Sequence, residues 1–171
     1  TEAEIISLAA EIEAKGGRAR AIACDITDGD ALAAAFDRIE KLDILINNAG
    51  TNVPMPFLEA DVASLDLIVS LNIRAAFLVA QAAARIMDRQ GGGVIIHMSS
   101  TFGKVGRPGS SVYSGTKHFI EGLTKSTAVE LAPRNIRVVA VGPTAIVTPL
   151  LADRLSDPDY AVQLTSRIPM G

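Results

Sequence analysis

A tyrosine and a lysine four residues apart could do acid–base chemistry together. In Tyr113-Ser114-Gly115-Thr116-Lys117, helical spacing puts the tyrosine and lysine side chains on one face. An isolated tyrosine titrates near pH ~10 and is a poor acid or base at neutral pH. A lysine cation about 4 Å away contributes roughly 4 kcal/mol at an effective dielectric of about 20, or about 3 pKa units before desolvation. The pair predicts a phenol whose pKa is lowered toward neutrality, although a packed ring beside an extended lysine has the same spacing.

A serine precedes this pair at a distance that a folded loop can bridge. Ser100 follows Val94–Met98, an apolar run with the pattern of a buried strand, and lies thirteen residues before Tyr113. The loop between them contains three glycines, so it can fold back and bring the serine hydroxyl beside the phenol. Alone, such a serine is a turn or cap residue. Serine, tyrosine and lysine in this order indicate a site that binds and protonates an oxygen.

Asparagines mark two further positions. Asn47-Asn48-Ala49-Gly50 directly follows an apolar strand run, although the usual hairpin signal is Asn-Gly. Its small residues would let a flat ligand lie against the backbone, and its amides could bridge neighbouring strands or bind a ribose. Asn72 interrupts an apolar helical run, where asparagine competes for backbone hydrogen bonds. There it either satisfies a helix distortion or holds a water.

Helical and strand patterns alternate along the chain. Thr1 and Glu4 form a capping box for a first helix that ends at Gly16-Gly17. Hydrophobic periodicity then predicts helices over about 28–41, 61–89 and 111–131, and strands over 19–26, 42–46, 94–98 and 136–141. Continuous apolar strands indicate an α/β fold with a doubly wound parallel sheet between two helical layers. The carboxyl ends of such strands meet at one edge, where ligands bind.

Composition limits the class of protein. The 16 basic and 19 acidic residues give a net charge of −3, which argues against a nucleic-acid partner. An apolar share of 49% excludes a disordered chain, and 171 residues suit one domain over residues 1–171. Polar residues interrupt Leu65–Met87, so we expect no membrane span. The single cysteine, Cys24, indicates a reduced, cytoplasmic compartment.

The remaining chemistry-bearing residues predict no metal site. No grouping of histidine, cysteine, aspartate and glutamate has the spacing of metal ligands. We expect His97 on its strand and His118 beside the Tyr-Lys pair to have structural roles rather than catalytic ones.

Taken together, these motifs resemble the classical short-chain dehydrogenase/reductase family over about residues 19–148. The resemblance implies a Rossmann-type sheet, NAD or NADP as cofactor, and hydride exchange between an alcohol and a carbonyl. Tyr113 resembles the catalytic acid/base, and Lys117 the lysine that lowers its pKa and binds the nicotinamide ribose. Ser100 resembles the serine that holds the substrate oxygen, and Asn72 the asparagine that anchors a proton-relay water.

The resemblance also implies a set of cofactor contacts. Asp25 and Ile26 resemble the pair beside the adenine ring. The segment Asn48, Ala49 and Gly50 resembles the one that passes under the cofactor. Pro143 through Thr148 resembles the segment that touches the nicotinamide carboxamide. Within it, the implied contacts are Pro143, Ile146 and Thr148.

The sequence departs from the family pattern in three places. The glycine-rich turn that holds the pyrophosphate does not occur in it, and the residue that selects NAD or NADP would lie just before Thr1. The chain stops at Gly171, before the family's last helix and strand, and has Gly142-Pro143 where the family usually has Pro-Gly. We therefore expect residues 1–171 to be the central part of a longer subunit, lacking its first βα unit and C-terminal elements. We expect this part alone to bind a dinucleotide poorly and not to turn over.

The function implied is an oxidoreductase that interconverts a secondary alcohol and a ketone, with a small-molecule substrate. Two other interpretations stay open: a non-catalytic dinucleotide-binding relative, and a sugar-nucleotide epimerase or dehydratase, which shares Tyr-x-x-x-Lys. The complete Asn72, Ser100, Tyr113 and Lys117 set argues against the first, and Asn-Asn-Ala-Gly argues against the second. The resemblance implies that the long helices pair across subunits in a homodimer or homotetramer.

Overall fold

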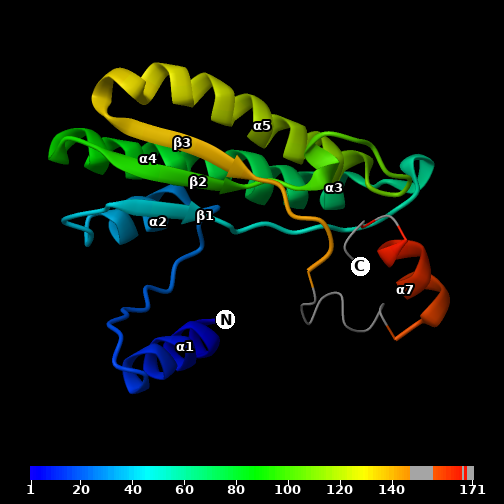
Figure 1. Ribbon diagram of the computed structural model, residues 1–171, viewed down its shortest axis with the longest axis horizontal. Coiled ribbons are helices and arrows are strands. Elements are labelled where there is room, and N and C mark those ends of the chain that lie inside the picture. The colour runs from blue at the N-terminus through cyan, green and yellow to red at the C-terminus, as the bar shows by residue number, and fades with distance from the viewer. Residues whose placement is uncertain (147–155, 167, 169–171) are drawn as a thin grey trace.

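The centre of the molecule is a parallel three-stranded sheet. The computed structural model describes residues 1–146, 156–166 and 168. Its strands are β1 (Ile44–Asn47), β2 (Gly93–Met98) and β3 (Ile136–Val141), in the order β1-β2-β3 (Figure 1). Asn47 pairs with His97, which pairs with Ala140, so all three strands end at the same edge. The expected α/β class with a parallel sheet is confirmed.

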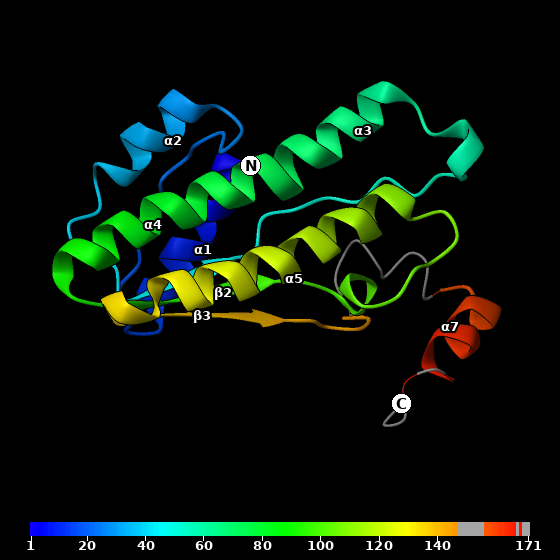
Figure 2. The same ribbon diagram turned by 90° about the horizontal axis from the view of Figure 1, so that it is seen from above.

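Helices connect these strands. The α-helices are α1 (Glu2–Ala14), α2 (Gly29–Phe36), α3 (Val62–Val69), α4 (Ala76–Gln90), α5 (Ser111–Leu131) and α7 (Pro158–Thr165). A π-helical segment, η2 (Ser70–Ala75), joins α3 to α4, so that the three form one long rod beside α5 (Figure 2). Short 3-10 turns cover Phe57–Glu59, Thr101–Gly103 and Ala132–Arg134. The expected capping box at Thr1 and Glu4 is confirmed.

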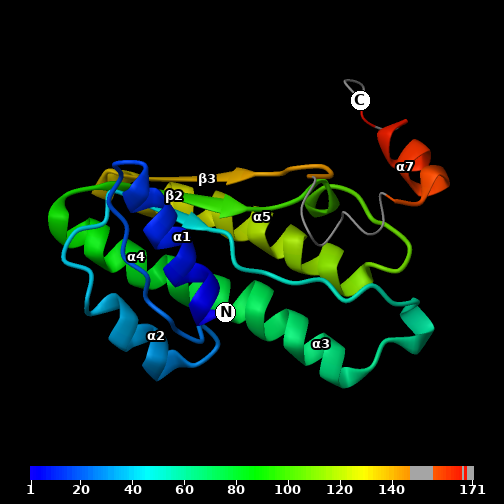
Figure 3. The same cartoon turned by 90° about the horizontal axis from the view of Figure 1, so that it is seen from below.

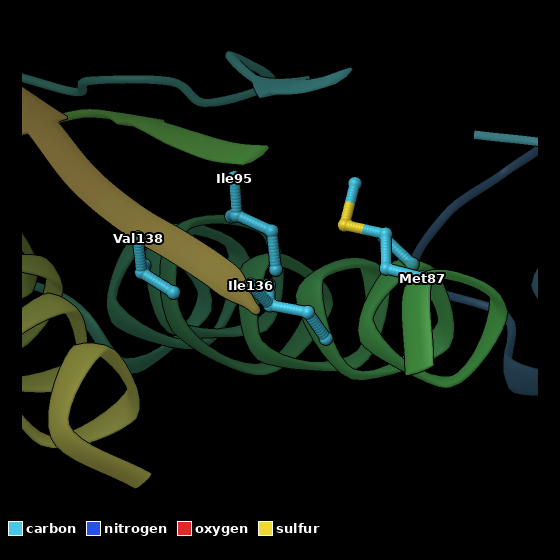
Figure 4. Packing of buried hydrophobic residues seen from close by; sticks show 5 residues of the cluster. Met87, Ile95, Ile136 and Val138 are labelled. Atoms are coloured by element: carbon cyan, nitrogen blue, oxygen red, sulfur yellow. The ribbon is translucent and has the colours of Figure 1, made fainter. Parts of the chain in front are cut away.

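The core lies between the sheet and α4. Ile95, Ile136 and Val138 project from alternate strand positions onto the helical side, where Met87 of α4 is fully buried among them (Figure 4). Contact is tightest at the start of β2. A Cβ atom on Gly93 would come within 2.5 Å of the Met87 side chain, so only glycine allows this approach of strand to helix.

The opposite face of the sheet carries exposed apolar side chains. Ile44, Ile46, Val139 and Val141 occupy the alternate strand positions and are about half exposed. The helix α1 lies apart from this face beyond β1 and buries none of its residues (Figures 1 and 3). Of the two helical layers expected, the described residues therefore supply one packed layer.

The predicted strand over residues 19–26 is wrong. This segment has no regular secondary structure, and a turn begins at Ile26. A strand needs a paired neighbour for its backbone groups, and in the described residues β1 pairs with β2 alone. The following helix is also shorter than predicted. Asp28 caps its start through Asp30 and Ala31, but it ends at Phe36.

The rod Val62–Gln90 is long and apolar enough, by length and composition, to cross a membrane. A core helix meets the same criterion. Here Ala83 and Met87 are buried against the sheet, although only 28% of the apolar window is buried. We interpret the rod as a core element, in keeping with the polar interruptions of its sequence.

Candidate active site

The segments after β2 and β3 run side by side at the sheet edge. The Ser99 amide donates to the Val141 carbonyl at 2.8 Å, and the Thr101 amide to the Pro143 carbonyl at 3.1 Å. Ser100 therefore lies where two strand ends meet, at the start of a 3-10 turn. Its hydroxyl oxygen accepts from the Phe102 amide at 3.2 Å, which fixes the side chain.

Tyr113 reaches this edge from the first turn of α5. Its ring lies edge-on to Phe102, with centroids 6.4 Å apart. Burial raises the pKa of the phenol above its ordinary value of 10.0, and the neighbouring Ser100 side chain opposes that shift only in part. The structure thus brings the phenol and the serine hydroxyl together, as the loop glycines predicted. The expectation of a pKa near neutrality is wrong for this structure, because burial outweighs the stabilisation of the phenolate.

Lys117 lies one turn further along α5 and is 7% exposed. Its Nζ donates to the Met98 carbonyl at 2.7 Å and lies 5.5 Å from the centroid of the Tyr113 ring. The ammonium therefore lies over the Tyr113 ring and is held at the end of β2. Burial lowers the pKa of Lys117 itself. Because burial dominates at Tyr113, this cation offsets less of the rise in the phenol pKa than the spacing alone suggested.

Asn72 sits in the π-helical segment η2 and is 2% exposed. Its Oδ1 accepts from the Thr51 amide at 2.8 Å, and its Nδ2 donates to the Thr51 carbonyl at 2.8 Å. The second Nδ2 hydrogen goes to the Thr116 hydroxyl at 3.2 Å. Asn72 thus lies within a helix distortion, but its side chain binds Thr51 and Thr116 rather than the backbone of that segment. Such π-turns recur at functional sites.

Two residues that sequence reasoning missed complete this network. Thr116 lies inside the Tyr-x-x-x-Lys motif and donates to the Tyr113 carbonyl at 2.8 Å while accepting from Asn72. Thr51 presents both its backbone groups to Asn72. Neither has a sequence signal, because one is a helix threonine and the other contributes only its backbone.

Two loops meet beside the start of α5. The Met55 amide donates to the Gly109 carbonyl at 3.0 Å, which ties the loop after β1 to the loop before Tyr113. Between them lies a cavity of about 560 Å³. Apolar side chains and glycine line it, namely Pro54, Met55, Pro56, Phe57, Pro108 and Gly109.

The predicted cofactor residues occupy several places. Asn48, Ala49 and Gly50 are exposed directly after β1, so this small, flat segment is open to a ligand. A Cβ on Gly50 would come within 3.2 Å of Asn72 Oδ1, so the segment passes close to the Asn72 side chain. Among the described residues, the Lys117 ammonium donates to the Met98 carbonyl, which leaves further donors for ribose hydroxyls. These features fit a dinucleotide.

The other predicted contacts lie around this segment. Asp25 is exposed, and its carboxylate accepts from the amide and hydroxyl of Thr27, which lowers its pKa. Ile26 is half-buried beside it. Pro143 is tied to Thr101, Ile146 is 56% exposed, and Thr148 lies outside the described residues. Within the described part of the chain, no histidine, cysteine, aspartate and glutamate side chains gather into a possible metal site.

Comparison with known proteins places the chain. Residues 1–159 match the short chain dehydrogenase family. L-xylulose reductase of Bos taurus is 37% identical over all of this chain and 69% of its own length, and cyclopentanol dehydrogenase of Comamonas testosteroni is 36% identical over 89% and 62%. The crystal structure of NAD⁺-bound xylitol dehydrogenase superposes with a TM-score of 0.93 at 28% identity, over 99% of this chain and 73% of that one. The chain therefore belongs to the short-chain dehydrogenase/reductase family and is an NAD(P)-dependent oxidoreductase that acts on CH–OH groups.

Proposed function

We propose that this protein interconverts a secondary alcohol and a ketone, with Tyr113 as the acid/base. The observation that carries the proposal is the position of the Tyr113 phenol beside the Ser100 hydroxyl at the sheet edge where β2 ends, near enough for that hydroxyl to favour the ionised phenol. A carbonyl oxygen placed between these two groups could receive a hydrogen bond from one and a proton from the other. The buried Lys117 beside the ring supplies the positive charge of the site.

In this proposal the residues divide the work of carbonyl reduction. Ser100 uses an acceptor lone pair on the Phe102 amide, so its own proton is free to hold the substrate oxygen. Tyr113 delivers the proton to that oxygen, and Lys117 stabilises the phenolate that remains. Asn72 joins the loop after β1 to the helix that carries Tyr113. When bound, the nicotinamide supplies the hydride.

We assign cofactor contacts to residues at the same edge. Asn48, Ala49 and Gly50 offer an exposed, flat segment, and Lys117 offers donors to the nicotinamide ribose. The family resemblance supports adenine contacts for Asp25 and Ile26. It supports carboxamide contacts for three further residues, namely Pro143, Ile146 and Thr148.

Substrates of the relatives define the test. The ketone–alcohol pairs L-xylulose with xylitol and cyclopentanone with cyclopentanol are incubated with the full-length protein and NAD(H) or NADP(H), and the absorbance of the reduced cofactor is followed. We expect net oxidation or reduction of the added cofactor with at least one pair. A sugar-nucleotide epimerase or dehydratase would instead change its substrate without net cofactor turnover. Cofactor binding without conversion of any carbonyl would favour the non-catalytic relative.

The raised pKa of Tyr113 predicts opposite pH dependences for the two directions. Alcohol oxidation needs the ionised phenol as base, whereas ketone reduction needs the protonated phenol as acid. We expect the oxidation rate to rise with pH through the pKa of Tyr113, and the reduction rate to fall over the same interval. Initial rates at saturating cofactor from about pH 6 to about pH 11 measure both. An oxidation rate that falls above neutral pH would contradict the assignment.

A further inference from the structure

Two buried polar side chains next to the site have no part in the proposed chemistry. Asn47 ends β1 and is 7% exposed, and His97 lies opposite it in the register of β2 and is 1% exposed. The Asn47 Nδ2 donates to the Ala76 carbonyl at 2.7 Å and lies 3.3 Å from His97 Nδ1. These contacts link two strands of the sheet to the first residue of α4.

The chemistry of these contacts fixes the state of both side chains. A carbonyl can only accept, so the nitrogen of the Asn47 amide must face Ala76. The remaining Nδ2 hydrogen points to the imidazole, and His97 Nδ1 must therefore be the acceptor. In the neutral ring the proton then resides on Nε2. Burial lowers the pKa of His97, which keeps the ring neutral.

The carbonyl that accepts from Asn47 belongs to Ala76, next to the segment that carries Asn72. Ala76 directly follows the π-helical segment η2, in which Asn72 holds the backbone of Thr51 and the hydroxyl of Thr116. A π-turn departs from the regular helical ladder, so its geometry depends on outside partners. The Asn47 amide is such a partner at its carboxyl end.

We propose that His97 is a positioning residue that orients the Asn47 amide and thereby fixes the π-helical segment that presents Asn72. An acceptor at Nδ1 holds the amide with its nitrogen toward Ala76. Without that acceptor, the buried Nδ2 hydrogen lacks a partner and the amide can rotate away from the carbonyl. The proposal rests on the proposed function, in which Asn72 belongs to the catalytic set.

Three variants of the full-length protein test this in the carbonyl-reduction assay. His97→Leu removes the acceptor at similar volume, and we expect kcat to fall about tenfold while the KM for the cofactor stays within about twofold. His97→Asn keeps an acceptor oxygen near the position of Nδ1, so we expect it to restore most of kcat. His118→Leu, at the exposed second histidine, is the matched control and should leave kcat unchanged. Equal losses in His97→Leu and His97→Asn would overturn the proposal.

A double-mutant cycle shows whether His97 acts through Asn72. In an Asn72→Ala background, we expect His97→Leu to cause little further loss of kcat. A full additional loss would overturn the proposal. If Asn72→Ala alone leaves kcat unchanged, the catalytic assignment of Asn72 fails. In that case the positioning of Asn72 by His97 can still be tested by hydrogen exchange of the Thr51 amide, which donates to Asn72 Oδ1. We expect the Thr51 amide to exchange faster in His97→Leu than in the unaltered protein. An unchanged exchange rate would count against the proposed positioning role of His97.

A measurement on the unaltered protein needs neither activity nor a folded variant. Long-range ¹H–¹⁵N NMR correlations distinguish the two neutral tautomers of histidine and the charged ring. We expect His97 Nδ1 to be unprotonated and Nε2 to carry the proton at neutral pH. A proton on Nδ1 would leave Asn47 without its acceptor and would overturn the proposal.

Discussion

Replacing Tyr113 with phenylalanine is expected to lower kcat by about 10³-fold, the middle of the range that a positioned acid contributes. The change removes one oxygen and keeps the ring, so the edge contact with Phe102 and the contact with the Lys117 ammonium stay in place. Binding of the reduced cofactor, followed by its fluorescence, should therefore change little. The loss should appear in kcat in both reaction directions.

The chain offers a matched control in its other tyrosine. Tyr160 lies on α7, and Tyr160→Phe removes the same oxygen from a residue that has no role in the proposed chemistry. We expect its kcat to remain close to that of the unaltered protein. Wild-type turnover by Tyr113→Phe would exclude Tyr113 as the acid/base.

Replacing Lys117 with methionine is expected to lower kcat/KM by about 10²–10³-fold, because a buried charge of the site is lost. Methionine matches the length of the side chain but takes away the cation above the Tyr113 ring and the donor to the Met98 carbonyl. Without the cation, the pKa of the Tyr113 phenol should rise further, and the pH profile of alcohol oxidation should move to more alkaline values. Cofactor binding should weaken as well, because the donors assigned to the ribose are gone.

The effect on cofactor binding distinguishes Lys117→Met from Tyr113→Phe. Tyr113→Phe should spare cofactor affinity, whereas Lys117→Met should lower both affinity and turnover. Lys125→Met, at an exposed lysine two turns further along α5, is the control for loss of a positive charge on this helix. Unchanged cofactor affinity together with an unshifted pH profile in Lys117→Met would contradict the role assigned to the lysine.

Local patterns predicted the regular elements best where periodicity is long or breaks sharply. The helix Ser111–Leu131 and the strand Ile136–Val141 have the predicted bounds, and the capping box of α1 is present. The segment 19–26 has the composition of a strand, yet a strand exists only through a neighbour, which its own sequence cannot reveal. The π-helical segment was also unreadable, because an asparagine in an apolar run fits either a regular helix or a distorted one.

The members of the site could be predicted, but their electrostatics could not. Spacing and loop glycines indicated that Ser100, Tyr113 and Lys117 come together, and the structure brings them together. The direction of the phenol pKa depends on burial and on where the ammonium points, which are tertiary properties. The supporting contacts of Thr51, Thr116 and His97 depend on segments far apart in the chain, so no local pattern could reveal them.

The hydrogen bond from the Met55 amide to the Gly109 carbonyl bears on how such a site can diverge. This hydrogen bond joins the loop after β1 to the loop before Tyr113. We therefore expect a replacement at residue 54 or 56 to shift the cavity lining at Pro108 as well. Substitutions in the two loops should therefore affect substrate selectivity together. Their combined effects should be epistatic rather than additive. Directed evolution of new substrate selectivity would accordingly gain more from randomising both loops together than from optimising each loop in turn.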